Sequence, residues 1–212
     1  MASSSHDLAR IREGTPGVYD RHAERYATER DTSLTLERDA LERFAAALPP
    51  GGRVLDLGCG TGLPVSAWLT DLGFAVTGLD ASPAMLSIAR REWPRGRWVR
   101  GDMRRLADCA ELVGETFHGV LSWHGSFHLT REEQRAALAG FAARVREGGA
   151  LMLTVGPEDG EVTGTVGGEA VYHASLSPEE YGRILRGEGF AAVEVLGTSG
   201  GAVVVLATGL SG

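Results

Sequence analysis

The sequence predicts an α/β protein with a doubly wound, seven-stranded sheet that is mostly parallel and ends in a C-terminal antiparallel hairpin. Five short apolar runs alternate with helical segments, which is typical of a parallel sheet with helices on both faces. Two further runs, residues 190–197 and 202–208, follow each other without a helix and predict the hairpin. The first of the seven runs opens a glycine-rich stretch that reads RVLDLGCGTGLP.

Composition restricts the class of partner. The chain has 212 residues, a net charge of −7 and a pI near 5.4, which disfavours binding to a nucleic-acid backbone. Two cysteines are too few for a disulfide framework and indicate a reduced, cytoplasmic setting. No apolar run reaches membrane-spanning length. We expect a monomer or homodimer with a flexible arm over residues 1–16, a single domain over residues 17–208 and a loose tail over residues 209–212.

The glycine-rich stretch has the form of a strand, a turn and a helix. Val54, Leu55 and Leu57 suit a strand buried on both faces. Glycines then recur at every second position (Gly58, Gly60, Gly62), where they allow positive φ and close approach of a ligand. A helix over residues 63–72 would point its free N–H groups into this turn. The arrangement predicts a nucleotide-type site, with Cys59 as a small packed residue rather than a reactive thiol.

Spacing excludes two common nucleotide sites. The dinucleotide fingerprint G-x-G-x-x-G fails, because its sixth position falls on Leu63 or Val65. The phosphate loop G-x-x-x-x-G-K-[ST] is absent, because the chain contains no lysine.

The second strand, residues 74–80, ends in a carboxylate. Asp80 lies where an acidic side chain can accept hydrogen bonds from both hydroxyls of a ribose. Its alternative role is to cap the helix that follows, but Ser82 before Pro83 suits that role better. Met85, in the first turn of this helix, would face the site or the core.

The D-x-G-x-G-x-G pattern starting at Asp56 resembles motif I of the class I S-adenosylmethionine-dependent methyltransferases. The resemblance covers about residues 19–208. It implies that Gly101, Asp102 and Met103, after a third strand over residues 97–100, receive the adenine ring, with the carboxylate on the exocyclic amine. A loop aspartate that caps the next helix is the alternative for Asp102.

The N-terminal segment VYDRHAERYATER also resembles the lid that many small-molecule methyltransferases carry over the cofactor. In this interpretation residues 17–48 form the lid, and Tyr19 and Tyr26 close it over the cofactor. The alternative is an amphipathic helix that only packs its aromatic side chains on the domain.

The fourth run starts at Phe117, ends near Ser122 and is followed by a loop at the ligand-binding edge of the sheet. Family members often have aspartate where this chain has His118. The loop lacks both [DNS]-P-P-[YF] and the Pro-Cys pair of cytosine-carbon methylation, so nucleobase methylation loses its two best signals. We assign His124 as a candidate general base, because histidine titrates near neutrality. No third ligand of suitable spacing accompanies His124 and His128, which disfavours a metal site.

Later segments complete the fold. We expect a helix over residues 131–146 closed by Gly148 and Gly149, a fifth strand over residues 150–155 and a helix from Pro178 to about Gly187. The glycine-rich excursion over residues 156–168 leaves the ligand edge, so it is assigned to the acceptor pocket together with Tyr172 and His173.

We therefore predict a methyltransferase that transfers a methyl group from S-adenosylmethionine, giving S-adenosylhomocysteine, to a small-molecule acceptor of unspecified identity. The alternatives are a non-catalytic protein that binds the cofactor or a partner, and a nicotinamide-dependent oxidoreductase, which the failed fingerprint disfavours. The residues predicted to contact the cofactor are Tyr19, Tyr26, Asp56, Gly58, Cys59, Gly60, Gly62, Leu63, Asp80, Ala81, Met85, Gly101, Asp102, Met103, Ser122, Trp123 and Phe127. Those predicted for the acceptor pocket are His124, Ser126, His128, Tyr172 and His173.

Overall fold

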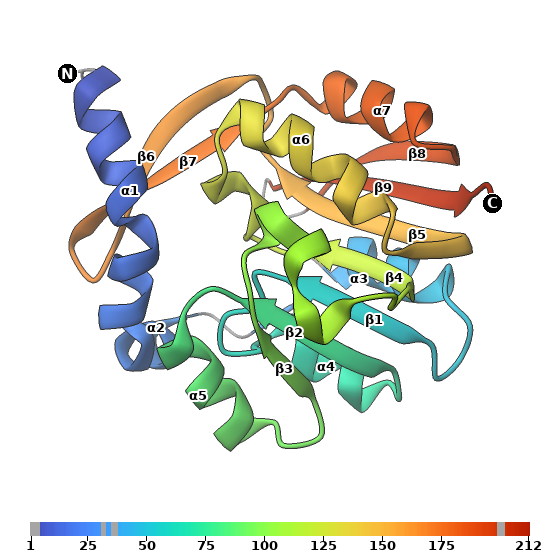
Figure 1. Cartoon of the computed structure of the whole chain (residues 1–212), viewed down its shortest axis with the longest axis horizontal. Helices are drawn as coiled ribbons and strands as arrows, with labels where there is room; N and C mark the ends of the chain where they lie inside the picture. The colour runs from blue at the N-terminus through green and yellow to red at the C-terminus, as the bar shows by residue number, and fades with distance from the viewer. Residues whose placement is uncertain (1–4, 31–32, 35–37, 199–201) are drawn as a thin grey trace.

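The computed structural model describes residues 5–30, 33–34, 38–198 and 202–212. A seven-stranded sheet in the order β3-β2-β1-β4-β5-β9-β8 forms its centre (Figure 1). The neighbours among β1 to β5 pair in parallel, and β9 pairs antiparallel with both β5 and β8. This confirms the predicted doubly wound, mostly parallel sheet. The strands are β1 Arg53–Leu57, β2 Ala75–Asp80, β3 Arg97–Arg100, β4 Phe117–Ser122, β5 Val145–Val155, β8 Phe190–Gly197 and β9 Val203–Leu210.

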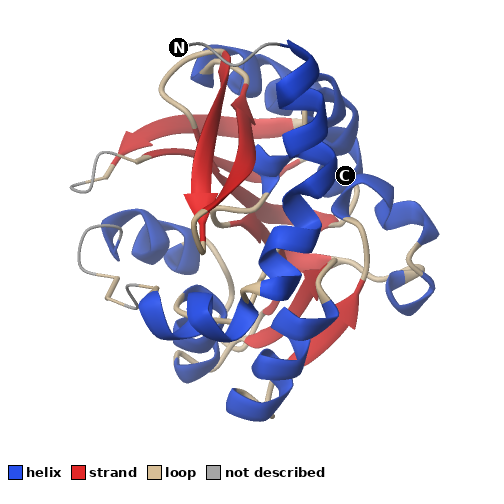
Figure 2. Cartoon of the chain, turned by 90° about the vertical axis from the view of Figure 1, so that its left-hand side faces the viewer, coloured by secondary structure: helices blue, strands red, loops and turns tan. Residues whose placement is uncertain are grey.

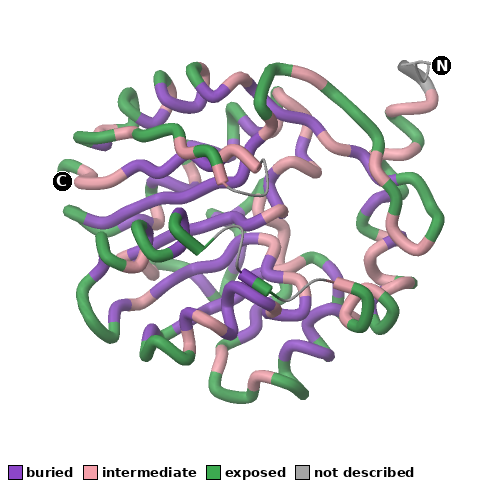
Figure 3. The backbone as a smooth tube through the Cα atoms, turned by 180° about the vertical axis from the view of Figure 1, so that it is seen from behind, coloured by how far each residue is buried: buried purple, intermediate pink, exposed green. Residues whose placement is uncertain are grey.

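Helices cover both faces of the sheet because its central strands are apolar on both sides, and Figure 3 shows that these strands are buried along much of their length. On β5, Leu151 and Leu153 belong to one core with α6 and α7, whereas Met152 belongs to a second core with α3 and α4. The helices in chain order are α1 Ser5–Arg21, α2 Ala23–Glu29, α3 Arg38–Ala46, α4 Val65–Asp71, α5 Pro83–Glu92, α6 Arg131–Ala142 and α7 Pro178–Gly187. Short 3₁₀ helices are η1 Met103–Asp108, η2 Ala110–Leu112 and η3 Ser126–His128. No described helix is both long and apolar enough to cross a membrane.

Both ends of the chain are more regular than predicted. The expected flexible arm over residues 1–16 is helical from Ser5 onward, in α1, because Thr15 and Val18 are buried where this helix packs on the hairpin and α5. The expected loose tail is strand as far as Leu210. Residues 1–4, residues 31–32 and 35–37 of the segment expected to form the lid, and residues 199–201 of the expected hairpin connection lie outside the described residues.

The predicted helix over residues 131–146 is too long by one turn. It ends at Ala142, and Val145 instead begins β5 by pairing with Phe117. Val145 is buried in the core, so sheet pairing outweighs the local helical pattern. Gly148, expected to close the helix, lies inside β5 with a φ of 73°, beside a shift in the β4–β5 register.

The excursion after β5 is a second, two-stranded sheet made of β6 Gly160–Val166 and β7 Glu169–Ser175. Gly167 and Gly168 have φ values of 59° and 87°, the positive values that a two-residue hairpin turn needs. Figure 2 shows this hairpin beside α1, and both elements stand over the edge of the main sheet. This pair is called the roof below.

One buried side chain, Gln134 of α6, fixes the roof to the domain. Its Nε2 donates to the carbonyl oxygens of Leu129 and Ala174, both at 2.9 Å, and its Oε1 accepts from the Tyr181 hydroxyl. The first partner lies in the loop after β4, the second on β7 and the third on α7. Gln134 is only 2% exposed, so water cannot replace these bonds.

We expect Q134L to lower the free energy of unfolding by about 2 kcal/mol or more, because three buried polar groups lose their partner. Y181F is the matched comparison and should cost less, because it removes only one of the three bonds. Urea denaturation of both variants measures the difference; equal costs would contradict the proposed bridging role.

Candidate functional site

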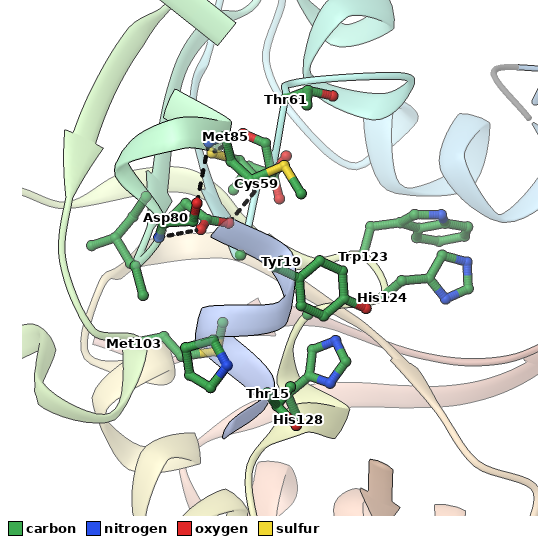
Figure 4. Close-up of a pocket in the computed structure, with 18 of the residues that line it drawn as sticks. Thr15, Tyr19, Cys59, Thr61, Asp80, Met85, Met103, Trp123, His124 and His128 are labelled. Carbon is green, nitrogen blue, oxygen red and sulfur yellow. Dashed lines mark hydrogen bonds between the residues drawn. The ribbon is translucent and has the colours of Figure 1, made fainter. Parts of the chain in front are cut away.

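A pocket opens at the edge where the parallel strands end, under α1 of the roof (Figure 4). It is formed by the turns after β1 and β2, the segment after β3, the loop after β4 and the first two helices. The predicted residues that line it are Tyr19, Tyr26, Asp56, Gly58, Cys59, Gly60, Gly62, Leu63, Asp80, Ala81, Met85, Gly101, Asp102, Met103, Trp123, His124 and His128.

The glycine turn is open toward the pocket rather than filled by protein. Gly58, Gly60 and Gly62 have φ values of 78°, 54° and 80°. A Cβ atom added at Gly60 would meet nothing within 4 Å, whereas one at Gly58 would lie 2.9 Å from the Met103 side chain. Gly58 is therefore needed for packing, and Gly60 leaves space for a ligand.

Asp80 connects this turn to α5. Its Oδ2 accepts from the backbone N–H of Gly60 and its Oδ1 from that of Ser82, both at 2.8 Å. Burial raises the pKa of the Asp80 carboxyl, and these hydrogen bonds act in the opposite direction. Ser82 caps α5 by accepting from the N–H of Met85, as its position before Pro83 predicts.

Asp56 is a buried carboxylate with one satisfied oxygen. Its Oδ2 accepts from the Ser66 hydroxyl at 2.7 Å, and no partner is recorded for Oδ1 within the described chain. The pKa of Asp56 is raised to about 7: burial is the largest cause and the charge of Asp80 acts in the same direction, whereas the Ser66 hydrogen bond and the Arg30 guanidinium lower it. A buried acid with an unused acceptor at a pocket wall suits a ligand that carries a cationic or hydrogen-donating group.

Asp102 lines the pocket and also caps η1, the alternative role considered for it. The Arg104 guanidinium donates hydrogen bonds to the Asp102 carboxylate, with Nε 2.9 Å from both oxygens and Nη2 2.6 Å from Oδ2. Burial tends to raise the pKa of Asp102, but the Arg104 hydrogen bonds more than offset this and keep the pKa below its usual value. Arg104 also bonds Glu133 of α6 at 3.1 Å.

The first two helices place aromatic and basic groups over the pocket. The rings of Tyr19 and Tyr26 meet edge to face with centroids 5.5 Å apart, and burial raises the pKa of Tyr19. Arg30 bonds the Tyr26 hydroxyl and lines the pocket, and its Nε has no recorded partner among the described residues.

Only some of the residues predicted for the site from the end of β4 and the loop after it line the pocket. Trp123, His124 and His128 line the pocket, and Phe127 does not. Ser122 and Ser126 are buried structural residues away from the pocket: the Ser122 hydroxyl donates to the Leu57 carbonyl at 2.7 Å and accepts from the Ser126 N–H at 2.9 Å. His124 has a φ of 54°, which is uncommon for a residue with a side chain.

The hairpin residues predicted for the acceptor pocket lie behind its wall. The side chains of Tyr172 and His173 do not line it. The Tyr172 backbone instead binds two pocket residues, with its N–H donating to Thr15 Oγ1 at 3.0 Å and its carbonyl 2.9 Å from His128 Nδ1. His173 packs against Phe127 and His128, with ring centroids 4.7 and 5.0 Å away.

Several pocket residues were missed from the sequence: Arg12, Thr15, Arg30, Thr61, Arg104 and Glu133. Only two had a usable signal. Arg30 follows Tyr26 by four positions, the spacing of one helix face. Arg104 is a basic residue two positions after Asp102, close enough in the chain to pair with it.

Cys59 behaves as the packed residue expected of it. It is 7% exposed, and burial raises the pKa of its thiol well above the usual value. In the described chain no group of three His, Cys, Asp or Glu side chains is arranged to hold a metal ion.

Part of the chain is similar to known methyltransferases. Residues 54–149 match the family model described as a methyltransferase domain. Glycine N-methyltransferase of Rattus norvegicus is 38% identical over 115 residues, which cover 48% of this chain and 39% of that protein. A dTDP-3-amino-3,4,6-trideoxy-alpha-D-glucopyranose N,N-dimethyltransferase of Streptomyces venezuelae is 31% identical over 117 residues, or 54% of this chain and 47% of that protein. The matches thus span less than half the length of these relatives.

The fold extends the similarity to nearly the whole chain. The structure of SAM-bound CalS10, an amino pentose methyltransferase from Micromonospora echinaspora, matches with a TM-score of 0.63 over 99% of this chain and 98% of that one. Its sequence identity is 22%, so this match establishes the shared fold.

The raised pKa of Asp56 predicts that this residue lowers stability as the pH rises. Between the usual pKa near 3.8 and the folded value of about 7, the folded protein binds more protons than the unfolded chain. The free energy of unfolding should therefore fall across this window, by about 1.4 kcal/mol per pH unit.

Urea denaturation of the wild type and of D56N at about pH 5 and about pH 8 tests this, because only the wild type carries the titrating group. The difference between the two proteins should change with pH in favour of D56N at the higher value. A difference that is constant with pH would contradict the assignment.

Proposed function

We propose that this chain, whose residues 54–149 match the model of a methyltransferase domain, is a class I enzyme that transfers the methyl group of S-adenosylmethionine to a small-molecule acceptor. The observation that carries this proposal is the open glycine turn with Asp80 bonded to its centre. A side-chain-free backbone next to a carboxylate suits a nucleoside whose ribose hydroxyls need acceptors.

The residues fit both ends of the cofactor. A carboxylate has about four lone-pair sites, and Asp80 uses one on each oxygen, so each can still accept from a ribose hydroxyl. Asp56 and Arg30 offer an unused acceptor and a guanidinium, which suit the ammonium and carboxylate of the methionine end. Asp102, held by Arg104, and Met103 would take the adenine ring.

When bound, S-adenosylmethionine supplies a methyl group that its own sulfonium activates. The protein's task is to align the acceptor and to exclude water. Tyr19 and Trp123 are buried or half-buried at the pocket, and the hydrogen bond between Thr15 and the Tyr172 backbone joins α1 to β7 within the roof.

The class of acceptor follows from the enclosure. A pocket under a helix and a hairpin admits a small molecule more readily than a nucleic acid, and the net charge of −7 acts in the same direction. We propose a cytoplasmic enzyme, monomeric or homodimeric; the buried, unpaired Cys59 and Cys109 suit a reducing compartment.

Isothermal titration calorimetry with S-adenosylmethionine and S-adenosylhomocysteine tests the proposal. We expect binding by the wild type and an affinity lower by about tenfold or more in D80N, because the amide loses one acceptor oxygen. D108N, which changes an exposed acid of η1, is the control and should bind as the wild type does.

Absence of heat with the wild type at millimolar ligand would reject cofactor binding. Binding without transfer to any member of a panel of small amines, phenols and carboxylates would instead favour a non-catalytic cofactor-binding protein.

A further inference from the structure

A backbone hydrogen bond determines which ring nitrogen of His128 carries the proton. Nδ1 of His128 lies 2.9 Å from the carbonyl oxygen of Tyr172 on β7. A carbonyl oxygen can only accept, so Nδ1 carries the hydrogen. In the uncharged imidazole the other nitrogen, Nε2, is then a lone-pair acceptor.

The surroundings keep this imidazole uncharged. The pKa of His128 is lowered to about 4, mainly by burial; the hydrogen bond to Tyr172 acts in the opposite direction, and the neighbouring His173 and His124 contribute to the lowering. The other titratable side chain in contact with the ring is Tyr19 of α1, at 5.0 Å between centroids. Arg12 and Glu133 line the same pocket.

The free nitrogen belongs to the pocket wall. His128 lines the pocket, and Figure 4 shows its ring beside Tyr19 and on the same side as His124. Within the described chain no hydrogen bond to Nε2 is recorded, and Nε2 is not among the buried polar atoms that lack a partner. A fixed acceptor is therefore accessible from the cavity.

We propose that Nε2 of His128 accepts a hydrogen bond from the nucleophile of the methyl acceptor and thereby selects an uncharged amine that keeps an N–H. This inference rests on the proposed methyl transfer. It moves the main catalytic role within the loop from His124, assigned from the sequence, to His128, whose tautomer the hairpin fixes.

The role is orientation of the lone pair. With one N–H held by Nε2, the nitrogen lone pair of an amine is free to attack the methyl carbon. The carbon–sulfur bond breaks, its electron pair stays on sulfur, and the methylated ammonium product later loses a proton to water. Because its pKa is far below neutrality, His128 stays an acceptor throughout the neutral pH range.

Two measurements on the full chain test the inference without the natural acceptor. Long-range ¹⁵N–¹H correlation spectra of the ligand-free protein should show His128 with the proton on Nδ1 at neutral pH. This readout does not depend on methyl transfer, so it separates failure of this inference from failure of the proposed function, which calorimetry with S-adenosylmethionine detects.

The second measurement compares two probes, aniline, which is uncharged at neutral pH and has N–H groups, and N,N-dimethylaniline, which has none. In the wild type we expect aniline to shift the Nε2 resonance and the dimethylated probe not to shift it. In H128N the amide can still donate to the Tyr172 carbonyl, but no acceptor occupies the Nε2 position. Aniline binding should therefore weaken about tenfold, with N,N-dimethylaniline unchanged.

H173N is the matched control, because it removes a neighbouring imidazole that does not line the pocket, and both probes should bind as in the wild type. A proton on Nε2, no response of His128 to aniline, or an equal loss of both probes in H128N would overturn the proposal. The last result would mean that His128 only supports the hairpin.

Discussion

The bridge that Asp80 makes between the Gly60 and Ser82 N–H groups holds the site open. One carboxylate, at the end of β2, fixes both the turn after β1 and the first turn of α5. Without Asp80 the backbone N–H of Gly60 would lose its hydrogen-bond acceptor, and no side chain from elsewhere in the described chain packs where a Cβ of Gly60 would lie, to hold the turn in place. Burial is the main cause of the raised pKa of Asp56, and repulsion by the charge of Asp80 at the neighbouring strand end adds to it. A bound cation or a donor to Asp56 would relieve that repulsion, so affinity for such a ligand is built into the strand ends.

The roof depends on buried contacts more than on its visible ion pairs. Arg21 and His22 both reach Glu169, at 2.6 and 2.7 Å, but exposed pairs of this kind contribute little to stability. The Tyr172 N–H bond to Thr15 is buried, and Gln134 ties β7 to α6, so breaking either leaves polar atoms without partners. The hairpin therefore supplies backbone groups that hold pocket residues in place, and its own side chains need not reach the pocket.

The sequence predicted most accurately what depends on burial and local chemistry. β3 and β4 could be placed at their observed bounds because each contains adjacent apolar residues that are buried, Trp98 and Val99 in β3 and Val120 and Leu121 in β4. Ser82 before Pro83 identified the start of α5. The end of α6 was wrong because Val145 prefers a distant partner, Phe117, which no local pattern shows. Ser122 is predicted to contact the cofactor because it ends β4 at the ligand-binding edge of the sheet. Its hydroxyl instead donates to the Leu57 carbonyl inside the sheet. The paired glycines at 167 and 168 are a local hairpin signal, because both adopt the positive φ of a two-residue turn.

The pocket wall combines charged side chains with aromatic ones, and the two kinds suit different parts of a ligand. Asp56, Asp80 and Arg30 offer ion pairs to a zwitterionic ligand and hydrogen bonds to a diol. Trp123, Tyr19 and His128 present ring surfaces and a lone pair without formal charge to the same pocket, which Arg12 and Glu133 also line. In the proposed role, a nucleophile that donates to the uncharged imidazole keeps its own lone pair, because it is not protonated by its partner. That role needs only the fixed tautomer of His128. His124, with its left-handed backbone, therefore does not have to supply a base.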